Sequence, residues 1–483
     1  MQRLTRTLKM SEWATIQRHC HRVKALGTLQ HVPVQTDKFC TMDLATSNEF
    51  LKYLQSRKSA LIAHTPKFLP NLTGLAWPCS WLGIHTLELV PHLLGPTLIH
   101  LSVWGHHGDS YIAPRNVLAA MMRILLIVPQ CSPSLKRLFY DYSMPEQDNQ
   151  VSNLLSTVIP KCPLLVEVSS HTIPLSEKAF KHLAGLPSLK LLVSAIPTTG
   201  YPETRRSSNP TFPSLRSCKL QAVNMQQIQT LLGSMGSREV DSLAVELNKT
   251  AGVTSDQFKS LLDLITQNQS SLRVLHITHA TRLALPQPNP DQILSFTDIS
   301  PMVNKFPNII QVCLVSSNFA IDLNDDDLRA MALAWPSLRV FQIRCTRPYC
   351  PRPSITLQSF LTFATYCPDL THLILNLDPS PPNDYLRRQG KEARHRRHTL
   401  QYLQIFVWNE LEFPSLLADF ILDLFPNVTV HAEPICPREG NRKLWLEWET
   451  FQPFMRGFVA ARRNTGRERL TEVNRDETMQ TDE

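Results

Sequence analysis

Apolar and polar residues alternate along the chain in one recurring phrase. The phrase is a proline, a small or polar residue, a leucine and, three positions later, a second apolar residue, as in Pro133-Ser134-Leu135 with Leu138. Several copies add another apolar residue two positions further on, for example Phe341 and Ile343 after Pro336-Ser337-Leu338. This alternation predicts a short strand with every second side chain buried, and the proline predicts the turn that leads into it.

The phrase recurs at an irregular period. Its first apolar anchors lie at positions 72, 98, 135, 165, 189, 215, 240, 272, 309, 338, 370, 400 and 428, which are 24 to 37 residues apart. Each interval has room for a helix, and residues 256–265 carry apolar side chains at helical spacing. One copy cannot bury its apolar side alone, so the copies must stack. We therefore predict an α/β fold, a leucine-rich-repeat solenoid with parallel strands on the concave face and helices on the convex face.

The two ends of the chain differ from the repeats. Residues 1–30 are predicted to form an N-terminal helix and capping segment, with a strand-like stretch at Arg22-Val23-Lys24-Ala25-Leu26. Residues 31–430 form the solenoid, with about 12–13 irregular repeats. Residues 431–464 are predicted to be a C-terminal capping helix that covers the open core, and the polar residues 465–483 a disordered tail.

The composition favours an intracellular protein whose fold is extended by repeats. The 483 residues are 43% hydrophobic, and 36 prolines against 15 glycines indicate stiff corners rather than flexible linkers. Several of the 11 cysteines, such as Cys218 and Cys313, lie in apolar strand-like runs, which predicts reduced, buried thiols. The first residues lack the apolar core of a signal peptide, and we find no transmembrane stretch. We expect a cytoplasmic or nuclear location, or both, and no membrane partner.

A resemblance to a known family rests on the ends as well as the middle. Leu8-Lys9-Met10-Ser11-Glu12-Trp13, followed by Cys20-His21-Arg22-Val23-Lys24-Ala25-Leu26, resembles the segment after the F-box in fungal F-box/leucine-rich-repeat proteins, especially those of mushroom-forming fungi. Cys162-Pro163-Leu164-Leu165 and Cys367-Pro368-Asp369-Leu370 are typical of their repeats, and Leu424-Phe425-Pro426-Asn427-Val428 of their last step. The resemblance covers nearly the whole chain.

The resemblance implies a division of labour between the F-box and the repeats. In that family the box docks on the Skp-type adaptor of a cullin-containing, SCF-type ubiquitin ligase, and the repeats hold the protein substrate. No box is recognisable before Leu8. An adaptor and a cullin are therefore expected as partners only if a box lies upstream, whereas a protein substrate on the concave face is expected in either case.

Aromatic residues just after the strand phrases are candidate partner anchors. They would lie at the rim of the concave face, where exposed aromatics bind partners well. Packing between neighbouring repeats is the alternative, and the sequence leaves both open. The candidates are Trp77, Trp104, Phe139 and Tyr140.

A basic run lies in the insertion before the strand at Leu403–Ile405. Its arginines are a second candidate for partner binding, as a patch for an acidic partner or as a nuclear-localisation signal. The alternative is a solvated helix face. The run includes Arg387, Arg388, Arg394, Arg396 and Arg397. The net charge of +8 is mild for this length and stacking aromatics do not interleave the run, so binding to nucleic acid is not the favoured hypothesis.

Other chemistry finds little support. Cys345 and Cys350 have no second pair nearby to complete a zinc site, so we expect a strand thiol and a loop thiol. Asp325-Asp326-Asp327 precedes a helical pattern and is expected to cap the helix rather than bind a cation. Nucleophile-elbow, phosphate-loop, dinucleotide and zinc-protease motifs are absent. We predict no catalytic residue, no cofactor and no metal.

The function that fits best is a non-catalytic protein-binding scaffold, an F-box/LRR-like substrate-recognition protein. One alternative is a repeat scaffold unrelated to ubiquitin, which binds protein or nucleic acid through its basic patches. Another is an enzyme carried on the α/β scaffold, which would show converging titratable groups in a deep pocket. An ordinary α/β sheet rich in Pro-x-Leu is the alternative fold, but such sheets need longer strands.

Overall fold

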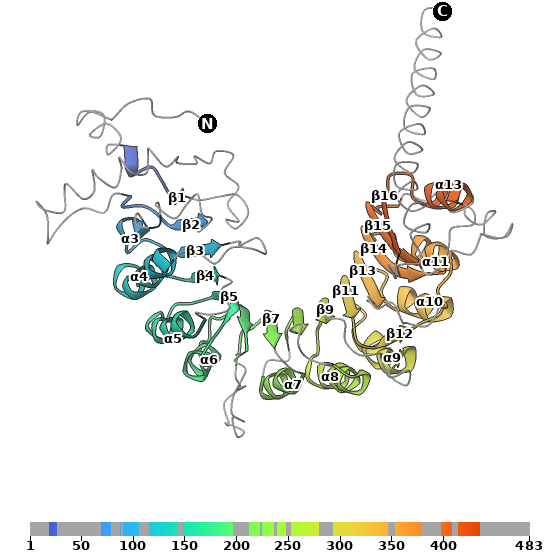
Figure 1. Cartoon of the computed structure of the whole chain (residues 1–483), viewed down its shortest axis with the longest axis horizontal. Helices are drawn as coiled ribbons and strands as arrows, with labels where there is room; N and C mark the ends of the chain where they lie inside the picture. Colours follow the sequence, from blue (N-terminus) through green and yellow to red (C-terminus); the bar gives the residue numbers. More distant parts are fainter. Residues whose placement is uncertain are drawn as a thin grey trace, which may run out of the picture. The chain divides into compact units, whose positions relative to one another are not determined.

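The computed structural model describes 14 stretches of the chain. These are residues 19–26, 69–78, 87, 90–105, 115–142, 148–196, 212–222, 225–235, 239–247, 253–279, 293–345, 353–378, 398–407 and 414–434. The chain divides into two units, residues 1–223 with 230–240 and residues 224–229 with 241–483. Each unit is described by itself (Figure 1).

In the first unit, strands alternate with helices and pair in parallel, each strand with the next one along the chain. The strands are β1 (Ala25–Leu26), β2 (Gly74–Pro78), β3 (His100–Gly105), β4 (Arg137–Tyr142), β5 (Glu167–Pro174), β6 (Leu191–Ala195) and β7 (Ser217–Ala222). The helices are α3 (Val90–Leu93), α4 (Arg115–Cys131), α5 (Asp148–Val158), the 3₁₀ turn η2 (Ile159–Lys161) and α6 (Glu177–Ala184), and α7 (Met225–Ser234) follows β7.

The second unit repeats the pattern. Its parallel ladder runs in the order β8 (Ser242–Leu247), β9 (Val274–His279), β11 (Gln311–Ser316), β13 (Val340–Cys345), β14 (His372–Leu377), β15 (Tyr402–Val407) and β16 (Thr429–Pro434). The helices are α8 (Ser255–Asn268), α9 (Phe296–Lys305), α10 (Asp325–Ala334), α11 (Gln358–Tyr366) and α13 (Pro414–Leu424). Two short strands, β10 (Ile293–Ser295) and β12 (Ala320–Asp322), pair separately.

The proline of the phrase forms the turn between helix and strand. Helix α10 ends at Ala334, and the amide of Leu338 donates to the carbonyl of Trp335 at 3.1 Å, so that Pro336 takes the second position of a four-residue turn. Proline suits that position because its ring fixes φ and it has no N–H to satisfy. The same bond closes the turn after α11, where Leu370 donates to Cys367 at 3.1 Å.

The residues that follow each turn set the register of the ladder. The amides of Arg339 and Val340 both donate to the carbonyl of Ile310 in the preceding repeat, at 2.8 and 3.2 Å. Thr371 and His372 bind the carbonyl of Arg339 in the same way, at 2.8 and 3.1 Å. Each repeat therefore enters the sheet at the same step as its neighbour, which puts equivalent side chains in continuous rows.

The core lies between the strands and the helices of each unit. All 13 predicted anchors are at most 3% exposed: Leu72, Leu98, Leu135, Leu165, Leu189, Leu215, Val240, Leu272, Ile309, Leu338, Leu370, Leu400 and Val428. Burying one such side chain contributes about 1.5–3 kcal/mol, so the repeat stabilises itself through stacking. The predicted α/β fold with parallel strands and a helical layer is confirmed, as is a strand at Ala25–Leu26.

Helix starts follow the polar residues that precede them. Asn324 caps α10, and its side chain and that of Asp327 each accept the other's backbone amide at 3.0 Å. Asp325 accepts from the amide and the hydroxyl of Thr356 at 2.9 and 2.6 Å. The prediction that this acidic run caps a helix is confirmed, and the carboxylates also lie where the helix dipole favours negative charge.

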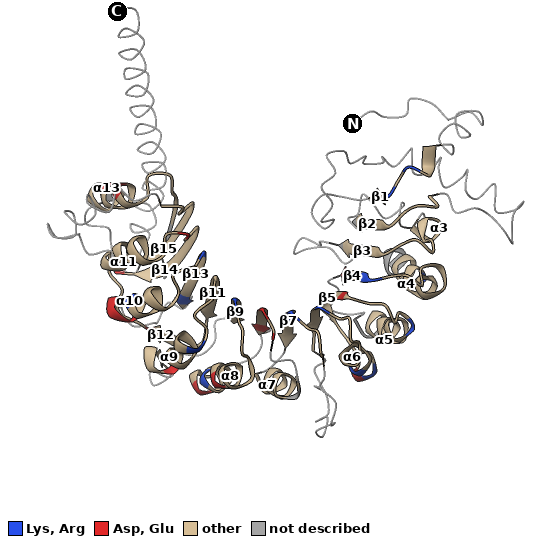
Figure 2. Ribbon diagram, turned by 180° about the vertical axis from the view of Figure 1, so that it is seen from behind, with Lys and Arg blue, Asp and Glu red and all other residues tan. Residues whose placement is uncertain are grey.

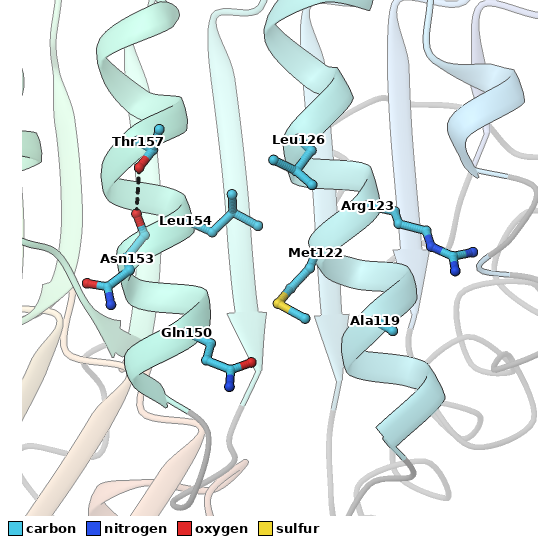
Figure 3. Close-up of a pocket in the computed structure, with 8 residues that line it drawn as sticks. All are labelled: Ala119, Met122, Arg123, Leu126, Gln150, Asn153, Leu154 and Thr157. Carbon is cyan, nitrogen blue, oxygen red and sulfur yellow. Dashed lines mark hydrogen bonds between the residues drawn. The ribbon is translucent and has the colours of Figure 1, made fainter.

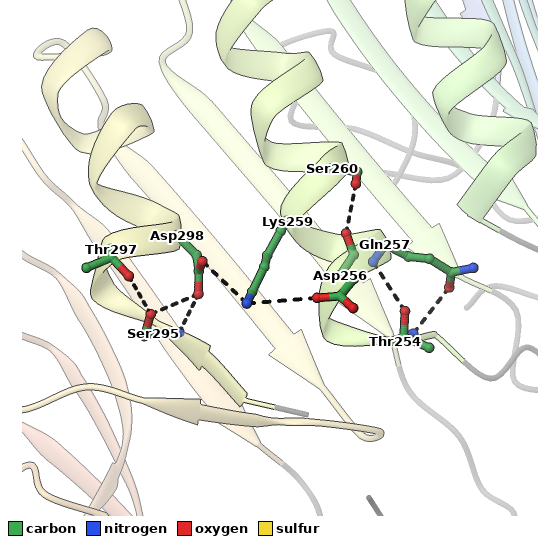
Figure 4. A network of polar contacts seen from close by, with 8 residues as sticks. All are labelled: Thr254, Asp256, Gln257, Lys259, Ser260, Ser295, Thr297 and Asp298. Atoms are coloured by element: carbon green, nitrogen blue, oxygen red, sulfur yellow. Dashed lines mark hydrogen bonds and ion pairs between the residues drawn. The ribbon is translucent and has the colours of Figure 1, made fainter. Parts of the chain in front are cut away.

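Polar contacts join the N-terminal turns of α8 and α9 (Figure 4). Thr254 and Gln257 form a capping box at the start of α8. Lys259 extends from α8 to the carboxylate of Asp298 on α9, with Nζ and Oδ1 3.5 Å apart, and to Asp256 at 3.9 Å. Asp298 also accepts from the amide of Ser295 at 2.9 Å, so one carboxylate both caps α9 and binds the neighbouring helix.

The predicted ends lie largely outside the described residues. Only residues 19–26 of the N-terminal capping segment and 431–434 of the predicted C-terminal helix are described, and the latter belong to strand β16. The C-terminal helix prediction is therefore wrong at its first four residues, because the last strand phrase continues to Pro434. The boundaries of the predicted solenoid and tail stay predictions.

Candidate functional site: the strand face

The face of each ladder that points away from the helices is the candidate site. In β7, β8, β9, β13 and β14 burial alternates, so that every second residue points toward the helices and its neighbours point to the other face. The pleat gives the other strands the same two faces, although β11 is buried at every residue after Gln311. We call this other face the strand face. In β11–β16 its rows contain aromatic, imidazole and amide side chains rather than a run of one kind of residue.

A row of tilted rings crosses three strands of the second unit. His372 on β14 lies against Tyr402 on β15 with ring centroids 5.7 Å apart, and Tyr402 lies against His431 on β16 at 5.1 Å. His372 is exposed, and the other two are half-buried. The hydroxyl of Tyr402 donates to the side chain of Gln404 at 3.2 Å. The three rings form a continuous aromatic row on this face.

A second row contains a cation. The guanidinium carbon of Arg344 on β13 lies 4.9 Å from the ring centroid of Phe406 on β15. Between them on β14, the amide of Asn376 donates to the carbonyl of Cys345 at 3.0 Å. A cation over an aromatic face is held at about 0.5–1 kcal/mol where water reaches it. Arg344 is half-buried, so its charge is oriented and yet within reach of a partner.

The first unit carries a different strand face. His100 on β3 stacks on Phe139 of β4 with centroids 5.2 Å apart, and Arg137 pairs with Glu167 at 3.1 Å. His100 is only 7% exposed. Burial, and secondarily the charge of Arg137, lowers the pKa of His100 from 6.5 to about 4. This imidazole is therefore neutral near pH 7, and the charges of that face belong to other residues, among them Arg137, Asp141, Glu167 and Lys219.

The four predicted aromatic anchors divide between the two faces. Trp77 is 8% exposed and Tyr140 is fully buried. Trp77 follows Leu75 by two positions and Tyr140 follows Leu138 by two, so both point toward the helices and pack in the core. This corrects their assignment as accessible anchors in favour of packing between repeats. Trp104 and Phe139 lie at strand-face positions and are half-buried.

The predicted basic run lies outside the described residues. Arg387, Arg388, Arg394, Arg396 and Arg397 fall in residues 379–397, so their role as a partner patch stays a prediction. The strand-face residues of β13–β16 were missed at the sequence level. Their signal was a polar residue between the two apolar positions of a phrase, as at Gln342 and Gln404.

Most of the cysteines in the described residues are buried thiols. Burial raises the pKa of Cys218 to about 12, and burial raises that of Cys313 to about 11 against an opposing effect of Arg344. Both are free, as predicted, and protonated at neutral pH. Cys345 differs: it is disulfide-bonded at the end of β13, which corrects its assignment as a strand thiol.

Metal binding finds no support in the part of the chain that the structure describes. The described ranges contain no group of three or more His, Cys, Asp or Glu residues arranged to hold a metal ion. In the same ranges, no helix combines the length and the apolar character needed to cross a membrane.

One parallel strand per repeat, a proline turn into each strand and a helical layer on one side define a leucine-rich-repeat fold. No protein-family model and no curated protein matches the chain. Among solved structures, it is similar to a chain of the Rad7 and Elc1 complex in yeast, at 14% identity over 89% of this chain and 96% of that chain, with a TM-score of 0.44. It is also similar to the leucine-rich repeat-containing protein LegL7 from Legionella pneumophila, at 10% identity over 62% and 83%, with a TM-score of 0.28. The fold assignment rests on the repeat geometry itself.

Proposed function

We propose that this protein is a non-catalytic scaffold that binds a protein partner on the strand face of its second unit. The observation that carries the proposal is the row of rings of His372, Tyr402 and His431, on the same face as the oriented cation of Arg344. Tyrosine and arginine are the residues that most often dominate binding energy in protein interfaces. Rings already held in place lose little conformational entropy on binding.

The same face is poorly suited to a nucleic acid. Among its positions in the described strands β11–β16, Arg344 is the one lysine or arginine. A phosphate backbone needs several cations at regular spacing, because release of counterions supplies most of the affinity. The mixture of amide, ring and single cation suits instead a polypeptide surface with carbonyl groups, apolar side chains and a carboxylate.

A narrower role follows from the resemblance to F-box/leucine-rich-repeat proteins. In that role the partner is a substrate, and ubiquitin transfer is performed by other subunits that the scaffold brings close. The chain itself would contribute binding and orientation. Direct binding of the purified full chain to a Skp-type adaptor tests this role separately. Because no box is recognisable before Leu8, failure to bind the adaptor would remove the ubiquitin role only if no F-box is encoded upstream, and the scaffold would then remain.

The strand face is tested by site-specific photocrosslinking in cells. A benzoylphenylalanine placed at Tyr402 is expected to yield one discrete protein adduct, identified by mass spectrometry. The same probe at Tyr366, a half-buried tyrosine on helix α11, serves as the matched control. Equal adducts from both positions would contradict the placement of the partner.

Charge deletion then tests the chemistry with the identified protein. Arg344→Ala is expected to weaken its binding to the full chain about tenfold or more, as truncation of a central anchor does. Arg329→Ala removes an exposed arginine from helix α10 and is expected to leave binding unchanged. Binding to nucleic acid with a steep salt dependence, and no protein adduct, would favour the alternative scaffold.

A further inference from the structure

Helix α4 is apolar on two sides. Its inner side fits the core, with Met121, Ile124, Leu125 and Val128 all fully buried. Its outer side repeats the apolar character at Met122 and Leu126, one turn apart, and Leu126 is 57% exposed. A helix that only covers a core needs one apolar stripe and presents polar residues to water. The second stripe therefore calls for a second partner.

The outer stripe forms one wall of a groove between α4 and α5 (Figure 3). The groove has a volume of about 540 Å³ and is open to solvent. Met122 and Leu126 point from α4 toward α5, and Leu154 points back from α5 toward them. The far wall carries Gln150, Asn153 and Thr157.

The walls limit what backbone can lie in the groove. Main-chain groups in the middle of α4 and α5 are bonded within their own helices, and the hydroxyl of Thr157 donates to the carbonyl of Asn153 at 2.9 Å. An extended peptide would find no main-chain partners there for its own N–H and C=O groups. A helix satisfies those groups internally and presents only side chains, so it fits this groove.

The charge beside the groove further limits which kind of helix can bind there. Arg123 is the one charged residue that lines the groove, is exposed, and extends from α4 on the side away from α5. Helix α4 contains no acidic residue to neutralise it. A partner helix lying in the groove would therefore gain from a carboxylate on its flank over α4.

We propose that the α4–α5 groove docks an amphipathic helix of a partner protein, with apolar residues one turn apart and an acidic residue on the flank that faces Arg123. Leu126 is the central anchor and Arg123 sets the orientation. This docking surface is on the helical layer of the first unit. It is independent of the strand face, and a partner held on one does not require the other.

A second copy of this chain is the competing occupant. In the second unit of such a copy, Leu333 on α10 is an apolar helix residue that is 54% exposed and could enter the groove. On the same helix, Asp326 lies seven residues before Leu333, and exposed Arg329 lies between them. Two of the three aspartates that begin α10 are already hydrogen-bonded, Asp325 to Thr356 and Asp327 to Asn324. The exposed charge nearest to Leu333 along the helix is the positive one of Arg329, so α10 matches the groove less well than a helix with a carboxylate next to its apolar residues.

Fluorescence anisotropy with the purified full chain tests the proposal. The probe is a fluorescein-labelled synthetic helix with leucines at positions i, i+3, i+4 and i+7 and glutamates on one flank. A second peptide replaces the glutamates by lysines. We expect saturable binding of the first peptide and at least about tenfold weaker binding of the second, because the groove offers only a positive charge.

Variants locate the binding. Leu126→Glu is expected to weaken binding of the acidic peptide at least about tenfold, and Arg123→Ala by several-fold, with the larger effect at low salt. Leu333→Glu, a matched exposed leucine, and Tyr402→Ala on the strand face are expected to change nothing. Absence of saturable binding, or equal binding to the Leu126→Glu and Leu333→Glu variants, would overturn the proposal. So would a dimer in sedimentation that is lost in either leucine variant, since the occupant would then be a second copy.

Discussion

The helix pairs α4–α5 and α8–α9 bury similar inner faces and expose opposite outer ones. Helix α8 buries Phe258, Leu261 and Leu262, much as α4 buries Ile124 and Leu125. Outward, α8 presents Lys259, which binds carboxylates on both helices (Figure 4), whereas α4 presents Met122 and Leu126 beside an open groove (Figure 3).

Charge makes the same distinction. Figure 2 shows both signs of charge on α8, whereas the charged residue that lines the α4–α5 groove is Arg123. In the helix pair α8–α9 the outward charges bind each other. In the helix pair α4–α5 the outer side keeps an apolar groove and a cation without an acidic residue on its own helix. Since the repeat requires only the inner face, the outer face is free to carry function, and the difference between the pairs points to where it does.

The largest expected loss of stability comes from truncating a buried core residue, and it should be similar in the two helix pairs. Ile124→Ala and Phe258→Ala each remove a fully buried side chain. We expect losses of about 2–5 and 3–5 kcal/mol of unfolding free energy, from lost burial plus the cavity left behind. Urea unfolding of the full chain, with hydrogen exchange in α4 and α8 to locate the loss, measures it. A loss below 1 kcal/mol in either variant would mean that the inner faces are not equivalent.

Lowering the pH should destabilise the repeat that contains α4 more than the repeat that contains α8. His100 on β3 belongs to the repeat that contains α4, and burial lowers its pKa from 6.5 to about 4. Between these values the unfolded chain binds a proton that the folded chain does not, so stability falls as pH drops from 6.5 to 4. The shift sets an upper limit of about 3 kcal/mol for this loss.

The variant His100→Phe removes that proton and keeps a ring against Phe139. We expect it to lose most of the acid sensitivity of the α4 repeat, measured by hydrogen exchange above pH 6.5 and near pH 4. The matched variant His372→Phe, at an exposed strand-face position, is expected to retain it. If both variants retain the sensitivity equally, another group is responsible.

The sequence predicted the inner face well and the outer faces poorly. A leucine two positions after a proline is buried wherever the turn recurs, because local chemistry fixes both the turn and the strand that follows. For Trp77 and Tyr140 the sequence analysis left partner binding and packing between repeats open, although each residue lies two positions beyond a buried leucine and so shares its face. The groove at Met122 and Leu126 could not be predicted, because it depends on which helix packs beside α4.

The bridge in the α8–α9 pair should contribute little to stability. Lys259→Met keeps the aliphatic stem and removes the charge near Asp298, whose side chain is 19% exposed. We expect a loss of about 0.2–1 kcal/mol that shrinks at high salt, because ion pairs near the surface are screened. Asp256→Asn, which alters the longer contact to an 89% exposed carboxylate, is expected to cost less. A loss that does not depend on salt would mean that Lys259 acts through packing.

The smallest change in stability should come from the residue that matters most to the proposed docking. Leu126→Gln replaces an exposed leucine by a residue of similar helix propensity, so the free energy of unfolding should change by no more than about 0.5 kcal/mol. If Leu126 instead stabilised the fold by packing, Leu126→Gln would lower the free energy of unfolding as much as replacing a partly buried leucine does. A loss above about 1.5 kcal/mol would therefore mean that the groove is closed by packing in solution, and the contrast between α4 and α8 would lose its functional meaning. A negligible loss, together with weaker binding of the acidic helix, would mean that Leu126 is kept for a partner, as Lys259 is kept for its own helix pair.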